Sequence, residues 1–176
     1  MRVVAGEAGG RRLIAPEGSD TRPTLDRVRE AMFNSLVSLG AVDGAKVLDL
    51  YAGSGALGIE ALSRGALSCV FVDTGRDARK AIATNLVTTG FVDQSIVAPQ
   101  DAVTWLRQVS TSAGLEHSRF DLVLIDPPYA AEDDLWSEVL SFVGIVAAGG
   151  VVVTESARPL AVPKGWDAQK EKRYGG

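Results

Sequence analysis

Four adjacent residues, Asp126, Pro127, Pro128 and Tyr129, have the chemistry to hold a planar amino group. The two prolines fix the backbone and have no N–H, so this segment offers acceptors: the Asp126 carboxylate and the Pro127 carbonyl. Tyr129 adds an aromatic face for stacking. Two acceptors bound to the hydrogens of an exocyclic amine favour a pyramidal nitrogen, whose lone pair can attack an electrophile. We interpret the segment as catalytic; the alternative is a rigid turn after a strand.

A glycine-rich segment is the second candidate site. The apolar run 47–50 ends at a turn containing Gly53, Ser54 and Gly55, and apolar residues then recur at helical spacing. Together with Gly58 these glycines fit the pattern G-x-G-x-x-G. Asp73 follows at the end of the next apolar run, where an acid could bind ribose hydroxyls. The pattern predicts a strand, a glycine loop and a helix that together bind a nucleotide-like ligand.

The charge beside this loop favours one kind of ligand. The carboxylate of Asp49 closes the strand next to the expected pocket, where it would repel the pyrophosphate of a dinucleotide. S-adenosylmethionine brings a sulfonium and an ammonium cation instead, and a carboxylate attracts both. We therefore favour a methyl donor. A nicotinamide or flavin dinucleotide, and a glycine loop that binds no ligand, remain as alternatives.

The remaining patterns predict the elements that must position these two sites. Strands are expected at 68–73, 95–98, 120–125 and 150–154, and helices at 25–39, 76–89, 102–109 and 133–143. Such alternation predicts an α/β, Rossmann-like fold: a mostly parallel twisted sheet with helices on both faces. Because ligands bind beyond the carboxyl ends of such strands, Asp126 should share a crevice with Asp49 and Gly53. At the N-terminus, runs 2–5 and 11–15 flank a glycine-containing loop and predict a small β-hairpin.

Composition limits the class of protein. A chain of 176 residues with 46% hydrophobic residues and a net charge of −4 fits one sizeable domain. It contains neither a long apolar stretch nor a basic-then-apolar leader, so we expect a cytoplasmic protein and no membrane partner. Cys69 should be a buried thiol, His117 a loop residue, and a His/Cys metal site is not expected. Basic residues outnumber acidic ones toward both ends, where an anionic partner could bind.

Two longer motifs resemble a known family. The segment 126–129 is similar to the (Asp/Asn)-Pro-Pro-(aromatic) signature of methyltransferases acting on planar amino nitrogens. Residues 22–34 and 49–66, Arg-Pro-Thr-Leu-Asp-Arg-Val-Arg-Glu-Ala-Met-Phe-Asn and Asp-Leu-Tyr-Ala-Gly-Ser-Gly-Ala-Leu-Gly-Ile-Glu-Ala-Leu-Ser-Arg-Gly-Ala, resemble the RsmD family. Members of that family place one methyl on N2 of a guanine in 16S ribosomal RNA. The resemblance extends from Arg2 to Tyr174.

The resemblance implies a role for each matching residue. Catalysis would belong to Asp126, Pro127, Pro128 and Tyr129. Binding of S-adenosylmethionine would belong to Asp49, Tyr51, Ala52, Gly53, Ser54, Gly55, Asp73, Asp101 and Ala102, with Asp73 standing where the family often has Glu. RNA binding would belong to Arg2, Arg11, Arg12, Arg22, Arg27 and Arg29.

The resemblance also implies a domain division and partners. Residues 1–40 would form an RNA-facing hairpin and helix, and residues 41–176 the S-adenosylmethionine-binding domain. Family members continue into another β-strand, so this chain is expected to lack the final strand. The implied partner of a monomeric enzyme is 16S ribosomal RNA, within a small-subunit particle. A DNA adenine-N6 methyltransferase and a non-catalytic RNA-binding assembly factor are the alternatives.

Overall fold

The computed structural model of the protein describes residues 1–16, 23–111, 119–127, 133–156 and 158–172. Five parallel strands form one sheet in the order β3-β2-β1-β4-β5. The strands are β1 (Lys46–Leu50), β2 (Ser68–Val72), β3 (Ser95–Ala98), β4 (Leu122–Ile125) and β5 (Val151–Thr154). The helices are α1 (Pro23–Ser38), α2 (Ala56–Ser63), α3 (Arg76–Thr89), α4 (Ala102–Val109) and α6 (Asp133–Val146), with a 3-10 turn η1 (Val92–Gln94).

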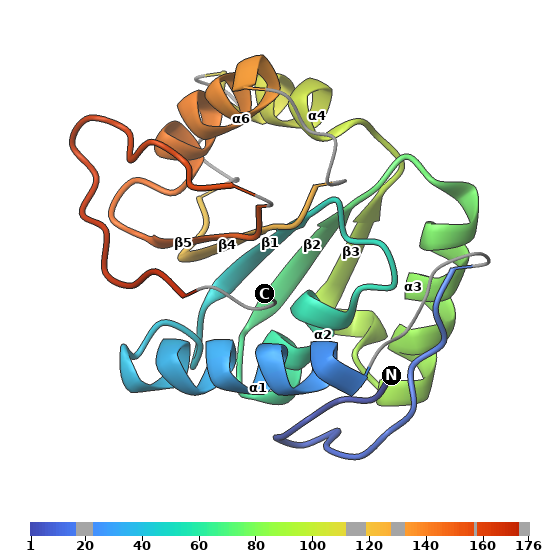
Figure 1. Cartoon of the computed structure of the whole chain (residues 1–176). Coiled ribbons are helices and arrows are strands. Elements are labelled where there is room, and N and C mark those ends of the chain that lie inside the picture. The colour runs from blue at the N-terminus through green and yellow to red at the C-terminus, as the bar shows by residue number, and fades with distance from the viewer. Residues whose placement is uncertain (17–22, 112–118, 128–132, 157, 173–176) are drawn as a thin grey trace.

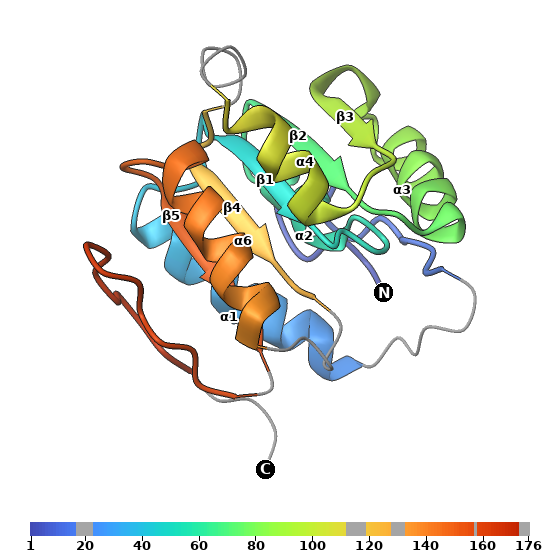
Figure 2. The same cartoon turned by 90° about the horizontal axis from the view of Figure 1, so that it is seen from above.

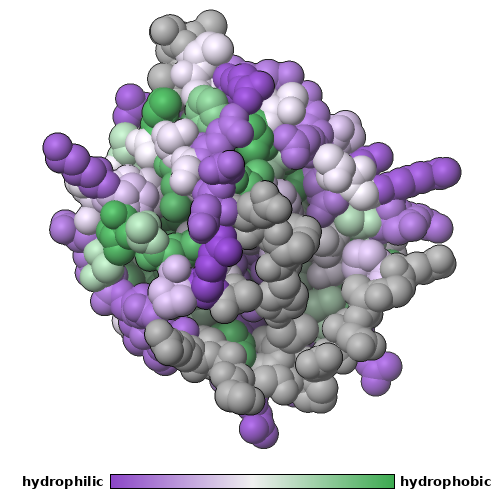
Figure 3. All heavy atoms as spheres, turned by 45° about the horizontal axis from the view of Figure 1, so that its top comes forward, coloured by the Kyte–Doolittle hydropathy of each residue, from purple (hydrophilic) through white to green (hydrophobic). Residues whose placement is uncertain are grey.

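Helices cover both faces of the sheet (Figure 1). Side chains of a strand alternate between the two faces, so Val47 packs toward α1, α2 and α3, whereas Leu48 packs toward α4 and α6. Figure 2 shows α4 and α6 side by side over the sheet, and a 2.6 Å ion pair from Arg107 to Glu138 joins them. Figure 3 views this side obliquely and shows hydrophobic side chains between hydrophilic ones. The alternating parallel α/β architecture predicted from the sequence is confirmed.

The strand order reverses between β1 and β4. From β1 the chain builds outward through β2 to β3, and it then returns to place β4 on the other side of β1. In register, Leu50 at the end of β1 lies beside Ile125 at the end of β4. Open α/β sheets bind ligands at such a reversal, because the two loops diverge and leave a crevice. The segments after Leu50 and Ile125 are the two candidate sites predicted from the sequence.

The N-terminal segment forms a shorter hairpin than expected. Its two arms join at a single antiparallel bridge between Arg2 and Arg12, while Val3 and Leu13 enter the core beneath the sheet. The arms do not extend into longer strands because the N–H groups of Val4, Ala5 and Ile14 bond to side chains of the main domain. The N–H groups of Val4 and Ala5 donate to Glu60 at 2.7 and 3.1 Å.

The described part of the chain contains no helix with both the length and the hydropathy of a membrane span. Cys69 is buried, as expected from its apolar surroundings in β2. His117, Arg22, Pro128 and Tyr129 lie outside the described residues.

Candidate active site

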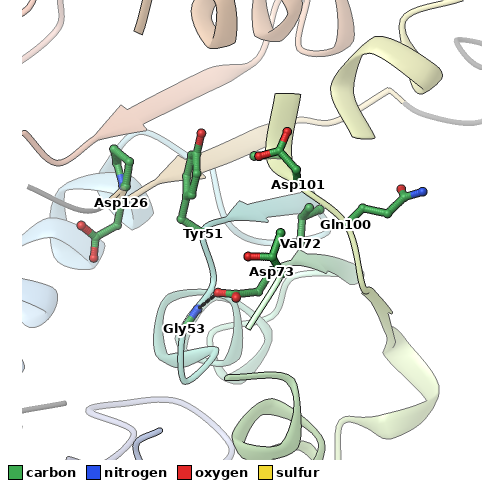
Figure 4. Close-up of a pocket in the computed structure, with 10 residues that line it drawn as sticks. Tyr51, Gly53, Val72, Asp73, Gln100, Asp101 and Asp126 are labelled. Carbon is green, nitrogen blue, oxygen red and sulfur yellow. Dashed lines mark hydrogen bonds between the residues drawn. The ribbon is translucent and has the colours of Figure 1, made fainter. Parts of the chain in front are cut away.

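A cavity of about 410 Å³ opens at the carboxyl edge of the sheet, beside the strand reversal. Its lining comes from the segments that follow β1, β2, β3 and β4 (Figure 4). The residues that line it are Tyr51, Gly53, Val72, Asp73, Thr74, Gln100, Asp101, Ala102, Asp126 and Pro127. Residues distant in the sequence meet here because parallel strands end at a common edge.

The loop after β1 has an unusual backbone. Tyr51 adopts a positive φ of 59°, which L-residues rarely adopt, and Gly53 has a φ of 55°. The turn closes when the Gly55 N–H donates to the Ala52 carbonyl at 2.7 Å, one residue before α2 begins. This conformation brings the Tyr51 ring between Asp126 and Asp101 in the view of Figure 4. Burial, followed by the charges of Asp101 and Glu138, raises the pKa of Tyr51 to about 12, so its hydroxyl stays protonated.

Asp73 holds the rim of the cavity together. One carboxylate oxygen accepts from the Gly53 N–H at 2.8 Å, drawn as the dashed line in Figure 4, and the other accepts from the Gly75 N–H at 2.7 Å. Each oxygen keeps a second lone pair, which can accept a hydroxyl of a ligand. Asp73 therefore fixes the glycine loop and can also bind a ribose.

Asp49 lies in β1 beside the glycine loop, but its side chain is buried under the loop and does not reach the cavity. Its side chain is only 1% exposed and is absent from the cavity lining, because it points to the face of the sheet covered by α2. There it accepts from the N–H of Gly58 at 2.9 Å. Burial is the main cause that raises its pKa, and the charges of Asp126 and Asp73 add to this. Asp49 therefore stabilises the glycine loop through Gly58 without contacting the cavity. Ala52, Ser54 and Gly55 are also part of the loop and do not line the cavity.

Asp101 and Asp126 are two further acidic residues that line the cavity. Asp101 begins α4 as its N-cap and accepts from the Thr104 N–H at 2.9 Å. Asp126 is open to solvent at the cavity. The protein around its carboxyl group still removes part of the water from it, and this burial, followed by the charge of Glu155, raises the pKa of Asp126 to about 7. Among the described residues, no cluster of His, Cys, Asp and Glu could hold a metal ion. The cavity is therefore an acidic site suited to a cationic organic ligand.

The predicted RNA-binding arginines separate into two groups. Arg2, Arg11, Arg12 and Arg27 are exposed, and Arg11 also donates to the Thr88 carbonyl at 2.7 Å. Arg29 is only 4% exposed. It donates to the Arg2 carbonyl and to Asp26, and its Nε lies 3.6 Å from the buried Glu60 carboxylate. Arg29 therefore fastens the N-terminal hairpin to the domain and is not accessible to RNA.

Two buried polar residues were missed by the sequence reasoning. Asn85 in α3 donates to the Ile14 and Ser54 carbonyls, both at 2.9 Å, and so ties the N-terminal segment to the glycine loop. Glu60, fully buried in α2, pairs with Arg64 at 2.7 Å as well as with Arg29. A polar residue on the apolar face of a helix was the available signal in both cases. The cavity-lining Val72, Thr74 and Gln100 carried no such signal.

Comparison with known proteins identifies the family. The whole chain, residues 1–176, matches the family described as Conserved hypothetical protein 95. The chain belongs to this family. It is the RsmD family, so the resemblance found in the sequence motifs is confirmed. The chain is similar to Ribosomal RNA small subunit methyltransferase D of Escherichia coli (strain K12), with 32% identity over 99% of this chain and 85% of the relative.

Solved structures show the same architecture. The structure of the Escherichia coli protein yhhF has a TM-score of 0.81 and 31% identity, over 99% of this chain and 92% of that one. A SAM-dependent methyltransferase from Agrobacterium tumefaciens shares the fold, with a TM-score of 0.62 and 20% identity, over 80% of this chain and 47% of that one. The fold is that of the Rossmann-like class I methyltransferases.

Proposed function

We propose that the protein is a methyltransferase that uses S-adenosylmethionine to methylate the exocyclic N2 of a guanine in 16S ribosomal RNA. The observation that carries this proposal is the position of Asp126 and Pro127, which line the same cavity as the glycine loop. Family membership supports it, since the Escherichia coli relative is named as a small-subunit ribosomal RNA methyltransferase. Our proposal takes guanine 966, the target base of the family, as the modified base.

The cavity fits S-adenosylmethionine in size and charge. A volume of about 410 Å³ lies in the range of small-molecule sites. The carboxylates of Asp73, Asp101 and Asp126 attract a ligand that carries ammonium and sulfonium charges, whereas they would repel a pyrophosphate. Asp73 would bind the ribose hydroxyls, and Asp101 with Ala102 would lie near the adenine. When bound, the cofactor supplies a methyl group activated by a positive sulfur.

Asp126 and Pro127 would hold the target amine. The Asp126 carboxylate and the Pro127 carbonyl each accept one hydrogen of the planar amino group, which aims the nitrogen lone pair into the cavity. Catalysis then comes mainly from alignment and from the placement of negative charge, which together can supply ~7 kcal/mol or more. With a pKa of about 7, Asp126 can also hold the proton that the amine loses. Pro128 and Tyr129 follow in the sequence, and we propose that they help to hold the target base.

The substrate would be an RNA surface with an accessible base. The target guanine must leave its stack to enter the cavity, which is easiest in a loop or bulge. Arg2, Arg11, Arg12 and Arg27 are exposed and can bind phosphates, and Arg22 joins them in the sequence-based proposal. We propose residues 1–40 as the RNA-facing part, a monomeric enzyme, and a small-subunit particle in the cytoplasm as its target.

Methyl transfer from tritiated S-adenosylmethionine tests the proposal directly. The substrates are small ribosomal subunits lacking the modification and the RNA extracted from them. We expect label in the RNA, digestion to N2-methylguanine, and a loss of about 100-fold or more in Asp126→Ala. Asp93→Asn, which changes an exposed acid at the opposite end of the sheet, is the matched control and should keep full activity.

Three results would contradict the proposal in different ways. Unchanged transfer by Asp126→Ala would remove the role of this segment. Methyladenine in the digest would identify an adenine-N6 enzyme. Binding of the methyl donor without transfer to any ribosomal substrate would identify a non-catalytic assembly factor.

A further inference from the structure

Glu155 lies beside Asp126 at the edge of the sheet that bears the cavity. The register of β4 and β5 pairs Ile125 with Thr154, so the next residue of each strand is Asp126 and Glu155. The Glu155 N–H donates to the Ile125 carbonyl at 2.9 Å, which continues the ladder to this point. Adjacent strands lie ~4.8 Å apart, so the two acidic residues begin about one strand spacing from each other.

No described cation forms an ion pair with either of the two carboxylates. Among the described residues, none of the ion pairs involves Asp126 or Glu155. The charge of Glu155 contributes to the raised pKa of Asp126, and burial raises the pKa of Glu155 itself. Two unpaired acids at neighbouring strand ends repel each other and disfavour the free state of the site. A ligand that presents two adjacent N–H donors would relieve this repulsion.

We propose that Glu155 determines the specificity of the site for guanine, by accepting the N1–H of the base whose N2 amino group is held by Asp126 and Pro127. This inference rests on the proposed function and adds to it a residue outside the Asp-Pro-Pro-Tyr segment. Guanine carries N1–H and the N2 amino group side by side on its Watson–Crick edge, so adjacent carboxylates can bind adjacent donors. Glu155 would position the base and take no part in the bonds that form and break.

The same arrangement rejects adenine. The N1 of adenine has a lone pair in place of a hydrogen, and it stands next to the N6 amino group. If that amino group bound to Asp126, the N1 lone pair would face the ionised carboxylate of Glu155, and two acceptors form no hydrogen bond. Sites built to bond a substrate N–H discriminate strongly against an analogue that lacks it, because their own polar groups are then left unpaired.

Replacing the target guanine with 2-aminopurine tests this pairing in the unaltered protein. This base keeps the amino group at C2 but has no hydrogen on N1. After the methylated guanine has been mapped, RNA carrying 2-aminopurine at that position is compared with RNA carrying guanine. We expect kcat/KM to be about 10- to 100-fold lower for 2-aminopurine. Equal values for the two bases would overturn the role of Glu155.

The variant Glu155→Gln tests the residue itself. A glutamine amide can donate to a bare N1, so the preference for guanine over 2-aminopurine should fall at least tenfold. A merely structural role would lower activity on both bases together and leave their ratio unchanged, and an unchanged ratio would overturn the inference. Asp93→Asn is the matched control, and circular dichroism with calorimetry of S-adenosylmethionine binding checks folding. Failure of the unaltered protein to methylate guanine RNA would instead overturn the proposed function, and this inference with it.

Discussion

The pKa of the Asp126 carboxyl group is determined by the residues around it. It is accessible from the cavity, yet burial by the surrounding protein and the charge of Glu155 raise its pKa to about 7. Near neutral pH it therefore exchanges a proton readily, which suits the role proposed above, in which it first accepts a hydrogen bond from the amine and then holds its proton. The raised pKa also means that the ionised form destabilises the fold.

The variant Asp126→Asn should reveal this destabilisation as a pH-dependent gain in stability. The pKa of the group is about 7 in the folded state and about 3.9 in the unfolded state, so folding favours the protonated form. The stability that this group contributes is fully present below about pH 4 and is lost as the pH rises through 7. We expect the variant to gain about 1 to 2 kcal/mol relative to the unaltered protein above pH 7, a value reduced for solvent screening.

Urea unfolding of both proteins between pH 4 and 9 measures this difference. The advantage of Asp126→Asn should grow from pH 4 to 7 and level off above. A difference independent of pH would show that the carboxyl titrates at its ordinary pKa. Asp93→Asn, changed at an exposed site, should show no such trend.

At the scale of elements, the glycine loop is held by close packing of α2 on β2. A Cβ built on Gly58 would lie 2.4 Å from Cε1 of Phe71 and 2.6 Å from Sγ of Cys69. No side chain fits there without separating the helix from the strand. The third glycine of the G-x-G-x-x-G pattern is thus needed for helix–strand contact, and the Asp49 bond to its N–H depends on that contact.

Gly58→Ala and Gly144→Ala form a matched pair of helix substitutions. At Gly58 the added methyl should cost about 1 to 3 kcal/mol through overpacking. At Gly144 in α6 the added methyl meets Trp166 at 3.5 Å, an ordinary contact, so the variant should gain about 0.5 to 1 kcal/mol from reduced backbone freedom. Thermal unfolding of the two variants measures both effects, and equal destabilisation would contradict the packing argument.

At the scale of the whole molecule, a net charge of −4 must be reconciled with an RNA partner. The acidic residues that line the cavity attract the cationic cofactor, whereas Arg2, Arg11, Arg12 and Arg27 are exposed in and after the N-terminal hairpin. Arg29, Glu60 and Asn85 attach that hairpin to α2, α3 and the glycine loop. These contacts would therefore link RNA bound at the hairpin to the glycine loop at the cofactor site.

The salt dependence of RNA binding tests whether these arginines contact phosphate. The logarithm of the association constant should fall linearly with the logarithm of salt concentration. The slope should decrease by about 0.7 to 0.9 for each contact removed in Arg12→Ala and Arg27→Ala. Arg107→Ala, which removes an arginine paired with Glu138 on the α4 and α6 side, is the control and should keep the slope. A slope near zero in the unaltered protein would contradict a basic RNA-binding surface.

The sequence by itself determined which segments form strands and helices along the chain, and which residues lie at the strand ends. Val47, Leu48 and Leu50 show an apolar run, and Gly53 and Gly55 mark a turn, because strand burial and turn geometry are local requirements that a short segment must satisfy alone. The family motifs added the expected roles of Asp73, Asp101, Asp126 and Pro127, which the structure brings to one cavity.

Tertiary structure decided which polar side chains face the cavity and which are buried supports. The sequence cannot distinguish Arg29 from Arg27, yet one is enclosed with Glu60 and the other is exposed. Asp49 belongs to the loop motif but is not among the residues that line the cavity, because its carboxylate is buried against the Gly58 N–H. Glu155 meets Asp126 only because β5 pairs in parallel with β4. Such contacts join residues far apart in the chain, and the pairing register and side-chain direction that create them are fixed by packing of the whole domain.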